Sequence, residues 1–285
     1  MIHGALVIEG GAMRSLYAAG ILDVLLENKM EFSYVIGSSA GTLVAANYIA
    51  KHIGRSLRIN VLHANDPNYF GLRHYIKSKG NIFNFSYLYQ APINDLYPYN
   101  TDALNNSKQR FIITATNCET GFPVYFEKRT YDEITKALTA SCSLPLITKI
   151  VDIDGCKCLD GGIATPVAIH KAIEDGNQKI VVILTRDSEY KKNELSPFVK
   201  AISKVMYKQY PALLKSLFEM PRYYNKLKDE IISLEKDGKI FVVRPKKPLA
   251  ISRTERDARK LLSAYFLGRD DMYDSMDKMM AYIGV

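Results

Sequence analysis

The chain has 285 residues, of which 47% are apolar and 24% charged, a composition typical of a globular protein with one substantial core. No apolar run reaches the roughly 18 residues that a membrane-spanning helix needs, and the first residues lack the basic segment and cleavage site of a signal peptide. We therefore exclude a protein with spanning helices, expect a cytoplasmic location, and look for an anionic partner that fits the net charge of +8.

The first 190 residues alternate short β-branched runs with helical patterns. Apolar runs predict strands, and apolar residues at helical spacing predict helices. Buried strands separated by helices are typical of a largely parallel sheet covered on both faces, so we expect an α/β fold. The predicted strands are 5–8, 34–36, 111–115, 124–126, 157–159 and 180–185, and the predicted helices are 16–26 and 40–50.

Residues 63–109 have a different composition, rich in Asn, Tyr and Pro, with several turn signals. We expect an irregular insertion. Its aromatic side chains either form a wall of a substrate cleft or pack only against one another. These aromatic residues are Tyr69, Phe70, Tyr75, Phe83, Phe85, Tyr87 and Tyr89.

After Arg186 the pattern becomes mainly helical, with a late strand at 240–243 and closing helices within 253–283. The first helical run pairs an apolar stripe with three lysines, and Pro211 separates it from a second apolar set. The run either packs its stripe onto the sheet or holds the protein on anionic membrane. The stripe is Phe198, Val199, Ile202, Val205 and Met206, and the lysines are Lys200, Lys204 and Lys208.

The basic charge is concentrated in this last third. Residues 1–190 contain 18 Lys and Arg against 18 Asp and Glu, whereas residues 191–260 contain 18 against 8. We therefore divide the chain into a catalytic domain, 1–190, and a basic, mainly helical extension, 191–285, packed on it. Because no nucleic-acid motif accompanies the charge, we expect no nucleic-acid partner and consider peripheral contact with anionic membrane, or a merely solvated basic face.

Gly37-Ser38-Ser39-Ala40-Gly41 is a G-x-S-x-G sequence between a predicted strand and a predicted helix. A nucleophile at so sharp a turn needs small neighbours, which Gly37 and Gly41 supply. The helix that follows directs free N–H groups and its positive dipole end at developing negative charge. The pattern predicts Ser39 as a nucleophile, and a tight turn without chemistry is the alternative.

Two further glycine-containing turns follow predicted strands. Residues 9–15, Glu-Gly-Gly-Ala-Met-Arg-Ser, open the first helix, and Asp160-Gly161-Gly162 follows strand 157–159. The first turn lacks both the G-x-G-x-x-G spacing and a Walker lysine, so it is our candidate oxyanion hole. Asp160, at a strand end, can reach across the carboxyl edge of the sheet, although alone it would indicate only a structural turn.

Together with residues 140–145, Ala-Ser-Cys-Ser-Leu-Pro, these blocks resemble the patatin-like phospholipase family, in the family's order over roughly residues 5–190. The resemblance implies a three-layer α/β fold with a mostly parallel central sheet, followed here by a mainly helical C-terminal region. It implies lipid acyl esters as substrates, with Ser39 as nucleophile and Asp160 as proton acceptor. The implied oxyanion loop is Gly10, Gly11, Ala12, Met13 and Arg14.

Two positions depart from the family pattern. Ala12 stands where a third glycine is usual, which keeps the N–H but restricts φ, and Ser15 replaces the glycine after Arg14. These departures leave the substrate range less well predicted than the Ser39–Asp160 dyad.

The proposed dyad needs no histidine, because an Asp can take the serine proton directly if low polarity raises its proton affinity. Among the five histidines, only His170 follows Asp160, as the Ser-Asp-His chain order of an α/β-hydrolase triad would require. We interpret it as a surface or core residue.

We expect no metal and no cofactor, because the Cys156-Lys157-Cys158 sequence has no second pair to complete a zinc site. The four cysteines are expected to be reduced thiols. The sequence thus predicts a serine lipid-acyl hydrolase of phospholipase A or lysophospholipase type, acting on a phospholipid or another acyl ester. The alternatives are a soluble carboxylesterase or thioesterase with the same dyad, and a non-catalytic lipid-binding protein.

Overall fold

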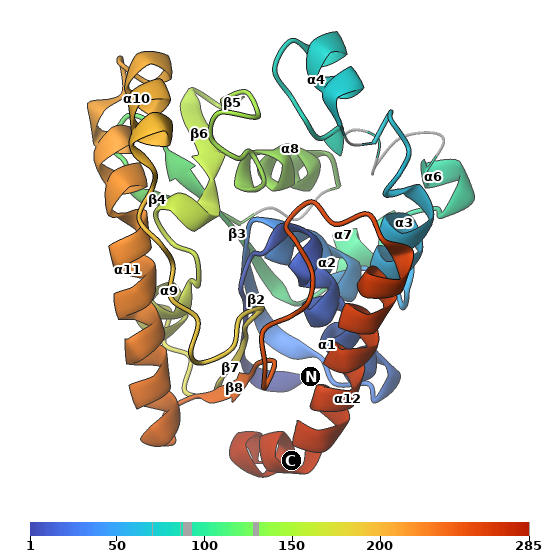
Figure 1. Ribbon diagram of the computed structural model, residues 1–285. Helices are drawn as coiled ribbons and strands as arrows, with labels where there is room; N and C mark the ends of the chain where they lie inside the picture. The colour runs from blue at the N-terminus through green and yellow to red at the C-terminus, as the bar shows by residue number, and fades with distance from the viewer. Residues whose placement is uncertain (70, 86, 88–92, 128–130, 285) are drawn as a thin grey trace.

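The computed structural model describes residues 1–69, 71–85, 87, 93–127 and 131–284 (Figure 1). In these ranges the strands form one sheet in the order β5-β6-β3-β2-β1-β7-β8, with β4 also paired to β3. The strands are β1 (Ile2–Ile8), β2 (Phe32–Ser38), β3 (Arg110–Asn117), β4 (Pro123–Glu127), β5 (Val151–Ile153), β6 (Cys156–Asp160), β7 (Ile180–Ile183) and β8 (Phe241–Val243).

The central strands are parallel, as the sequence predicts. β1 pairs with β2 and β7, β2 with β3, and β7 with β8, all in the parallel sense. Their carboxyl ends therefore open at the same edge of the sheet, where ligands bind in open α/β folds. The residues that follow β1, β2, β7 and β8 all meet at this edge.

The antiparallel part of the sheet brings two strand ends together. On β3, Thr114 is paired with Ser38 of β2 and Tyr125 of β4, whereas the next residue, Ala115, is paired with Asp160 of β6 and Val124 of β4. Since a strand has only two edges and β4 occupies one of them, β2 and β6 share the other edge. β2 runs parallel to β3 and β6 antiparallel to it, so their carboxyl ends meet.

Helices cover both faces of the sheet. The described helices comprise two short 3₁₀ turns and the α-helices in Figure 1. They are η1 (Ala12–Arg14), α1 (Ser15–Glu27), α2 (Ala40–Ile49), α3 (Arg55–His63), α4 (Leu72–Ser78), α6 (Ile93–Leu96), α7 (Thr101–Asn106), α8 (Tyr131–Ser141), η2 (Gly161–Ile163), α9 (Ile169–Glu174), α10 (Pro197–Met206), α11 (Pro211–Lys236) and α12 (Ala258–Ile283).

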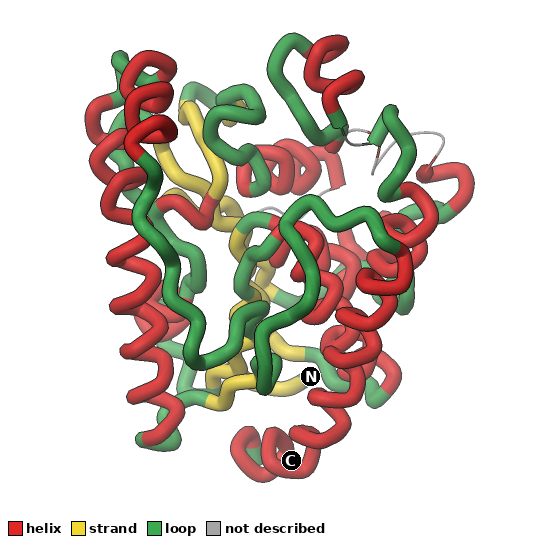
Figure 2. Tube along the Cα trace, viewed as in Figure 1, coloured by secondary structure: helices red, strands yellow, loops and turns green. Residues whose placement is uncertain are grey.

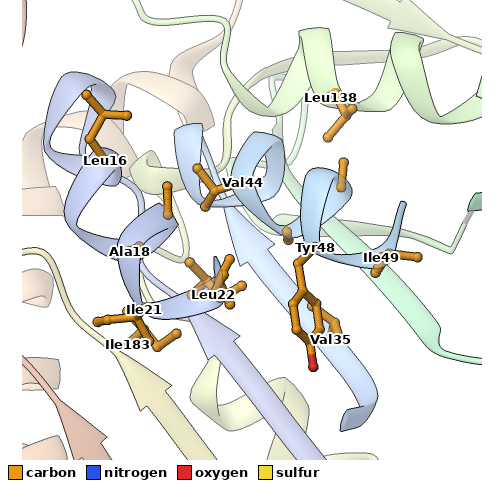
Figure 3. Close-up of a cluster of buried hydrophobic side chains, with 14 of the residues drawn as sticks. Leu16, Ala18, Ile21, Leu22, Val35, Val44, Tyr48, Ile49, Leu138 and Ile183 are labelled. Carbon is orange, nitrogen blue, oxygen red and sulfur yellow. The ribbon is translucent and has the colours of Figure 1, made fainter. Parts of the chain in front are cut away.

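The side chains of β1 show how the three layers are separated. Leu6 and Ile8 are buried in a core cluster with α1, α2, α8 and α12, while Ala5 and Val7 are buried in another with α9 and α11. Successive residues of a strand point to opposite faces, so the uninterrupted apolar run fits a sheet covered on both sides. Figure 3 shows α1 and α2 packing Leu22 and other apolar side chains onto this sheet.

The C-terminal residues take part in every layer. β8 extends the sheet beside β7, α11 covers one face and α12 the other. The contact between α1 and α12 is close, since a Cβ on Gly20 would lie 2.1 Å from the carbonyl oxygen of Tyr265. The helical C-terminal region is thus as expected, and the division at residue 190 stays a prediction.

The apolar stripe of α10 does not pack onto the sheet. Phe198 is 72% exposed and Val205 77%, and Ile202 and Met206 are also exposed. Of the two alternatives for this stripe, packing onto the sheet is therefore contradicted. The buried side chains of α9 and α11 cover that face instead. In the part of the chain that the structure describes, no helix has the length and apolarity to cross a bilayer.

Among the described residues of the segment 63–109, the short helices α4, α6 and α7 alternate with irregular chain, which fits the expected irregular insertion. Tyr69 stacks on Tyr87 with ring centroids 5.6 Å apart, and Phe83 lies 5.9 Å from Phe85. Two of the aromatic residues named from the sequence, Phe70 and Tyr89, lie outside the described residues.

Candidate active site

Ser39 occupies the sharp turn between β2 and α2. Its φ of 52° lies in the left-handed region, which costs energy for a residue other than glycine and is typical of a nucleophile turn. A Cβ on Gly41 would come within 2.7 Å of the carbonyl oxygens of Ile8 and Glu9. A Cβ on Gly37 would meet Gly41 itself at 2.9 Å. Both glycines therefore let β1 and the new helix crowd against the turn.

Asp160, at the end of β6, faces this turn. The Ser39 hydroxyl donates to Asp160 Oδ2 at 2.6 Å, and the Gly162 N–H donates to Oδ1 at 2.7 Å. The carboxyl is buried, with 4% of the residue exposed, and this burial raises its pKa to about 6 against the hydrogen bonds from Ser39 and Gly162. At neutral pH the group is thus ionised and more basic than an ordinary aspartate.

The 140–145 block connects the two residues. The Ser39 N–H donates to the Ser141 hydroxyl at 3.0 Å, and the Asp160 N–H donates to the Ser143 carbonyl at 2.8 Å. The Thr116 hydroxyl also holds the Asp160 carbonyl at 2.8 Å. Ser141 and Ser143 therefore position both residues. The sequence identified this block as a match to the family but did not predict these contacts.

The loop after β1 lies against the serine. A Cβ on Gly10 would lie 2.7 Å from the Ser39 Cβ, so only glycine permits this approach. Gly11 and Ala12 line a cavity at Ser39, and Ala12 has a φ of 51°, a conformation that glycine adopts more easily. The Met13 N–H instead donates to the carbonyl of Arg253 at 3.4 Å. Gly11 and Ala12 are therefore the better-placed amides of this loop for an oxyanion.

A buried carboxylate fixes the start of this loop. Glu9 is 3% exposed and accepts hydrogen bonds from the Thr185 N–H at 2.6 Å, the Thr185 hydroxyl at 3.1 Å and the Tyr224 hydroxyl at 2.7 Å. Burial raises the pKa of Glu9, and these hydrogen bonds oppose the rise. Tyr224 belongs to α11, so a C-terminal helix supports the glycine loop, a connection that the sequence did not reveal.

Two cavities meet at Ser39, and both include Ala12 and Leu144 in their walls. The apolar cavity, of about 810 Å³, lies between α1, α2, α3 and the 63–109 segment. Its side chains include Leu16, Leu43, Val44, Ile59, Phe83 and Phe85. The aromatic residues of the insertion therefore form a wall of the cleft as well as packing against one another.

The basic cavity, of about 1170 Å³, lies on the other side of Ser39. Figure 2 shows in green the two long loops, 184–196 after β7 and 244–257 after β8, that contribute to its wall. Its cationic side chains are Arg14, Arg186, Lys192 and Arg253. Arg14 thus lies in the wall of a cavity beside Ser39, within the loop that the sequence identified.

No histidine among the described residues lines either cavity. His170 lies on α9, where its Nε2 is 2.8 Å from a carboxylate oxygen of Glu230, and its side chain is 44% exposed. Of the surface and core positions that the sequence left open for it, the structure shows the surface one. Within the described ranges, no group of three or more His, Cys, Asp or Glu could hold a metal ion, and Cys156 and Cys158 are free thiols.

Comparison with known proteins assigns families to two parts of the chain. The model of the patatin-like phospholipase family matches residues 6–173, and a domain of unknown function (DUF6363) matches residues 210–284. The uncharacterized protein YjjU of Escherichia coli (strain K12) is 26% identical over 190 residues, which cover 65% of this chain and 52% of that relative, so the chain spans about half of its length.

Among solved structures, VipD from Legionella pneumophila aligns with a TM-score of 0.46 at 12% sequence identity, over 98% of this chain and 67% of that one. The patatin-like model covers more than half of the chain and includes both Ser39 and Asp160. The chain therefore belongs to the patatin-like phospholipase family, a family of lipid hydrolases.

Proposed function

We propose that this protein is a serine lipid-acyl hydrolase of phospholipase A or lysophospholipase type. Ser39 would be the nucleophile and Asp160 its general base. The observation that carries the proposal is the 2.6 Å hydrogen bond from the Ser39 hydroxyl to a buried carboxylate whose pKa is raised to about 6. A base of this proton affinity can accept the serine proton as the oxygen attacks an ester.

The reaction has two steps. The Ser39 oxygen attacks the ester carbonyl while its proton moves to Asp160, and the Gly11 and Ala12 N–H groups donate to the developing oxyanion. Asp160 then returns the proton to the leaving alcohol, which departs and leaves an acyl-serine. A water molecule attacks this intermediate, gives its proton to Asp160, and the fatty acid is released as the proton returns to Ser39.

The apolar cavity supports a fatty-acyl substrate. Burial of a chain against Leu43, Phe83 and Phe85 removes apolar surface from water, at roughly 0.8 kcal/mol for each methylene group. Selectivity should therefore increase with chain length until the cavity is full. A soluble carboxylesterase or thioesterase with the same dyad would instead show little gain from a longer acyl chain.

The exposed face of α10 supports action at a membrane surface. Phe198 and Val205 project from this helix into solvent, and Lys204 and Lys208 lie on or beside it. An apolar face with flanking lysines fits the interface of an anionic bilayer. A cytoplasmic location with peripheral membrane contact is part of the proposal, and nucleic acid is not among the expected partners.

Covalent labelling with a fluorophosphonate tests the nucleophile. We expect the wild-type protein to be labelled at Ser39 and the Ser39→Ala variant not to be labelled. A Ser233→Ala variant, which changes an exposed serine of α11, serves as the matched control and should label normally. Labelling of Ser39→Ala as strong as that of the wild-type protein would exclude Ser39 as the nucleophile. Absence of label in the wild-type protein, together with hydrolysis of no ester in a panel of phospholipids and lysophospholipids, would leave a non-catalytic lipid-binding protein instead.

A further inference from the structure

Four cationic side chains line the cavity on one side of Ser39. Arg14 comes from η1, Arg186 and Lys192 from the loop after β7, and Arg253 from the loop after β8. Because β1, β7 and β8 are parallel neighbours, these loops leave the sheet at the same edge. Three of the four cations lie outside residues 6–173 and therefore outside the match to the patatin-like model.

These cations have no carboxylate partner within salt-bridge distance among the described residues. The Arg186 guanidinium lies 3.9 Å from the ring centre of Tyr190, and Lys192 Nζ lies 4.9 Å from that of Tyr224. The Arg14 Nε is buried without a hydrogen-bond partner. Aromatic rings thus lie against Arg186 and Lys192, and among the described residues no direct ion pair neutralises any of the four charges.

The two acidic residues of the cavity wall are already engaged. Glu9 accepts from Thr185 and Tyr224, and Asp160 accepts from Ser39 and Gly162. Four cations against two acids leave an excess of positive charge beside the nucleophile.

The cations also repel one another. Burial first, then Arg253 and Arg186, lower the pKa of Lys192 to about 8, while Glu9 and Asp160 oppose this change. Burial and the same two arginines lower the pKa of Arg14 to about 10. Burial of unpaired charges away from water costs free energy, and a bound anion would offset that cost.

We propose that the basic cavity binds a phosphate group on the alcohol side of the scissile ester. The inference rests on the proposed function and names its substrate class, an acyl ester whose leaving alcohol carries phosphate, such as an anionic lysophospholipid. The two cavities meet at Ser39, so an acyl chain in the apolar cavity directs the alcohol portion into the basic one. Guanidinium and ammonium groups donate charge-assisted hydrogen bonds to phosphate oxygens.

A pair of esters that differ only in phosphate tests this inference. 1-Octanoylglycerol 3-phosphate and 1-octanoylglycerol are assayed below their micellar concentrations, so that surface effects do not contribute. We expect kcat/KM to be at least about tenfold higher for the phosphate ester, since each hydrogen bond to a charged group contributes measurably. Equal kcat/KM values for the two esters would overturn the inference and leave the proposed function intact. Hydrolysis of neither ester would instead contradict the proposed function.

Variants of the cavity wall locate the preference. Lys192→Met should reduce the ratio of the two kcat/KM values by about tenfold, Arg253→Met should also reduce it, and Lys192→Arg should preserve it. Lys236→Met, at the exposed end of α11, is the matched control and should keep the wild-type ratio. An unchanged ratio in Lys192→Met and Arg253→Met, with thermal unfolding at the wild-type temperature, would contradict the assignment.

Inorganic phosphate distinguishes a substrate group from a free anion. We expect phosphate to inhibit hydrolysis of the phosphate ester competitively, and to do so less in Lys192→Met. Inhibition by phosphate together with equal kcat/KM for both esters would show a site for free anions only, and would overturn the proposal that the cavity recognises the substrate.

Discussion

Residues 6–173, which match the patatin-like model, contain Ser39, Asp160 and the glycine loop. Residues beyond 173 contain neither proposed reacting group, yet they provide Thr185 and Tyr224, which hold Glu9 below that loop. The first region has the arrangement that ester chemistry needs, and the second determines its support and its electrostatic surroundings. The excess of basic residues also lies beyond residue 173, since residues 191–260 contain 18 Lys and Arg against 8 Asp and Glu, whereas residues 1–190 contain 18 against 18.

Under the proposed function, a site built from a common motif acquires its selectivity from a different part of the chain. Changes in the first region should therefore affect the rate with every ester. Changes to the cationic side chains of the second region should have effects that depend on the charge or the physical state of the substrate.

The largest effect is expected from the dyad itself. Ser39→Ala and Asp160→Asn should each lower kcat by about 10³-fold or more, and the double variant should be little worse, because the two residues act as a unit. The kcat of each variant is measured with a soluble octanoyl ester. His170→Ala is the control and should change the rate by less than about tenfold, since loss of a true general base costs about 10²–10⁴-fold.

Near-normal turnover in Asp160→Asn would exclude Asp160 as the base. A large loss in His170→Ala with an intact fold would instead restore a histidine mechanism. His170 is half-exposed and paired with Glu230, which is why we expect neither outcome.

The glycine loop should be the next most sensitive element. Ala12→Pro removes one N–H and cannot adopt the φ of 51°, so it should lower kcat by about 10²-fold or more. Ala12→Gly keeps the N–H and relaxes the backbone, and it should retain activity. An active Ala12→Pro variant would place the oxyanion hole elsewhere. Inactivity of both variants would indicate a requirement for the alanine side chain.

The pH dependence of the rate follows from Asp160. Its pKa is raised to about 6 by burial, and only the ionised carboxylate can accept the serine proton. Below pH 6 the ionised fraction falls about tenfold for each pH unit, so kcat/KM for a neutral ester should fall likewise and level off above pH 7. Incubation at each pH followed by assay at pH 7.5 separates this effect from unfolding. A profile still flat at pH 4.5 would contradict the assignment.

The parts of the site that the sequence predicted are those encoded locally. A strand, a small-residue turn and a helix predict the Ser39 turn without knowledge of distant residues. The same holds for the helix at 16–26 and for most strands, whose apolar runs are continuous. The contact of Ser39 with Asp160 followed only from the family resemblance, because it depends on β2 and β6 sharing one edge of β3.

The remaining parts depend on tertiary contacts that leave no local pattern. Ser141 and Ser143 act through single hydrogen bonds to Ser39 and Asp160. Arg186, Lys192 and Arg253 lie in loops without periodicity. Only the basic excess of residues 191–260 indicated Lys192 and Arg253, and no sequence pattern indicated Arg186. The stripe of α10 was ambiguous for a related reason, because an amphipathic helix has the same sequence pattern against a sheet or a membrane.

Binding to vesicles tests the second region alone. Charge reversal at Lys200, Lys204 and Lys208 should weaken binding to anionic vesicles by about tenfold or more at low salt, since each basic residue near the surface contributes roughly 1 kcal/mol. Hydrolysis of a soluble neutral ester should be unaffected. Lys236→Glu, at the far end of α11, is the control for net charge. Equal binding of the wild-type protein to neutral and anionic vesicles, at low and high salt, would contradict an electrostatic contact.

The smallest effect should come from the link between the two regions. Tyr224→Phe removes a 2.7 Å hydrogen bond to buried Glu9, and should lower the free energy of unfolding by about 1–3 kcal/mol. Because Glu9 precedes Gly10, the glycine loop should loosen and kcat should fall a few-fold for neutral and phosphate esters alike. Tyr223→Phe is the matched control, since the Tyr223 hydroxyl makes no hydrogen bond to another described residue. If both variants unfold at the same urea concentration, the bond to Glu9 does not support the loop, and the catalytic segment is independent of α11 at this point.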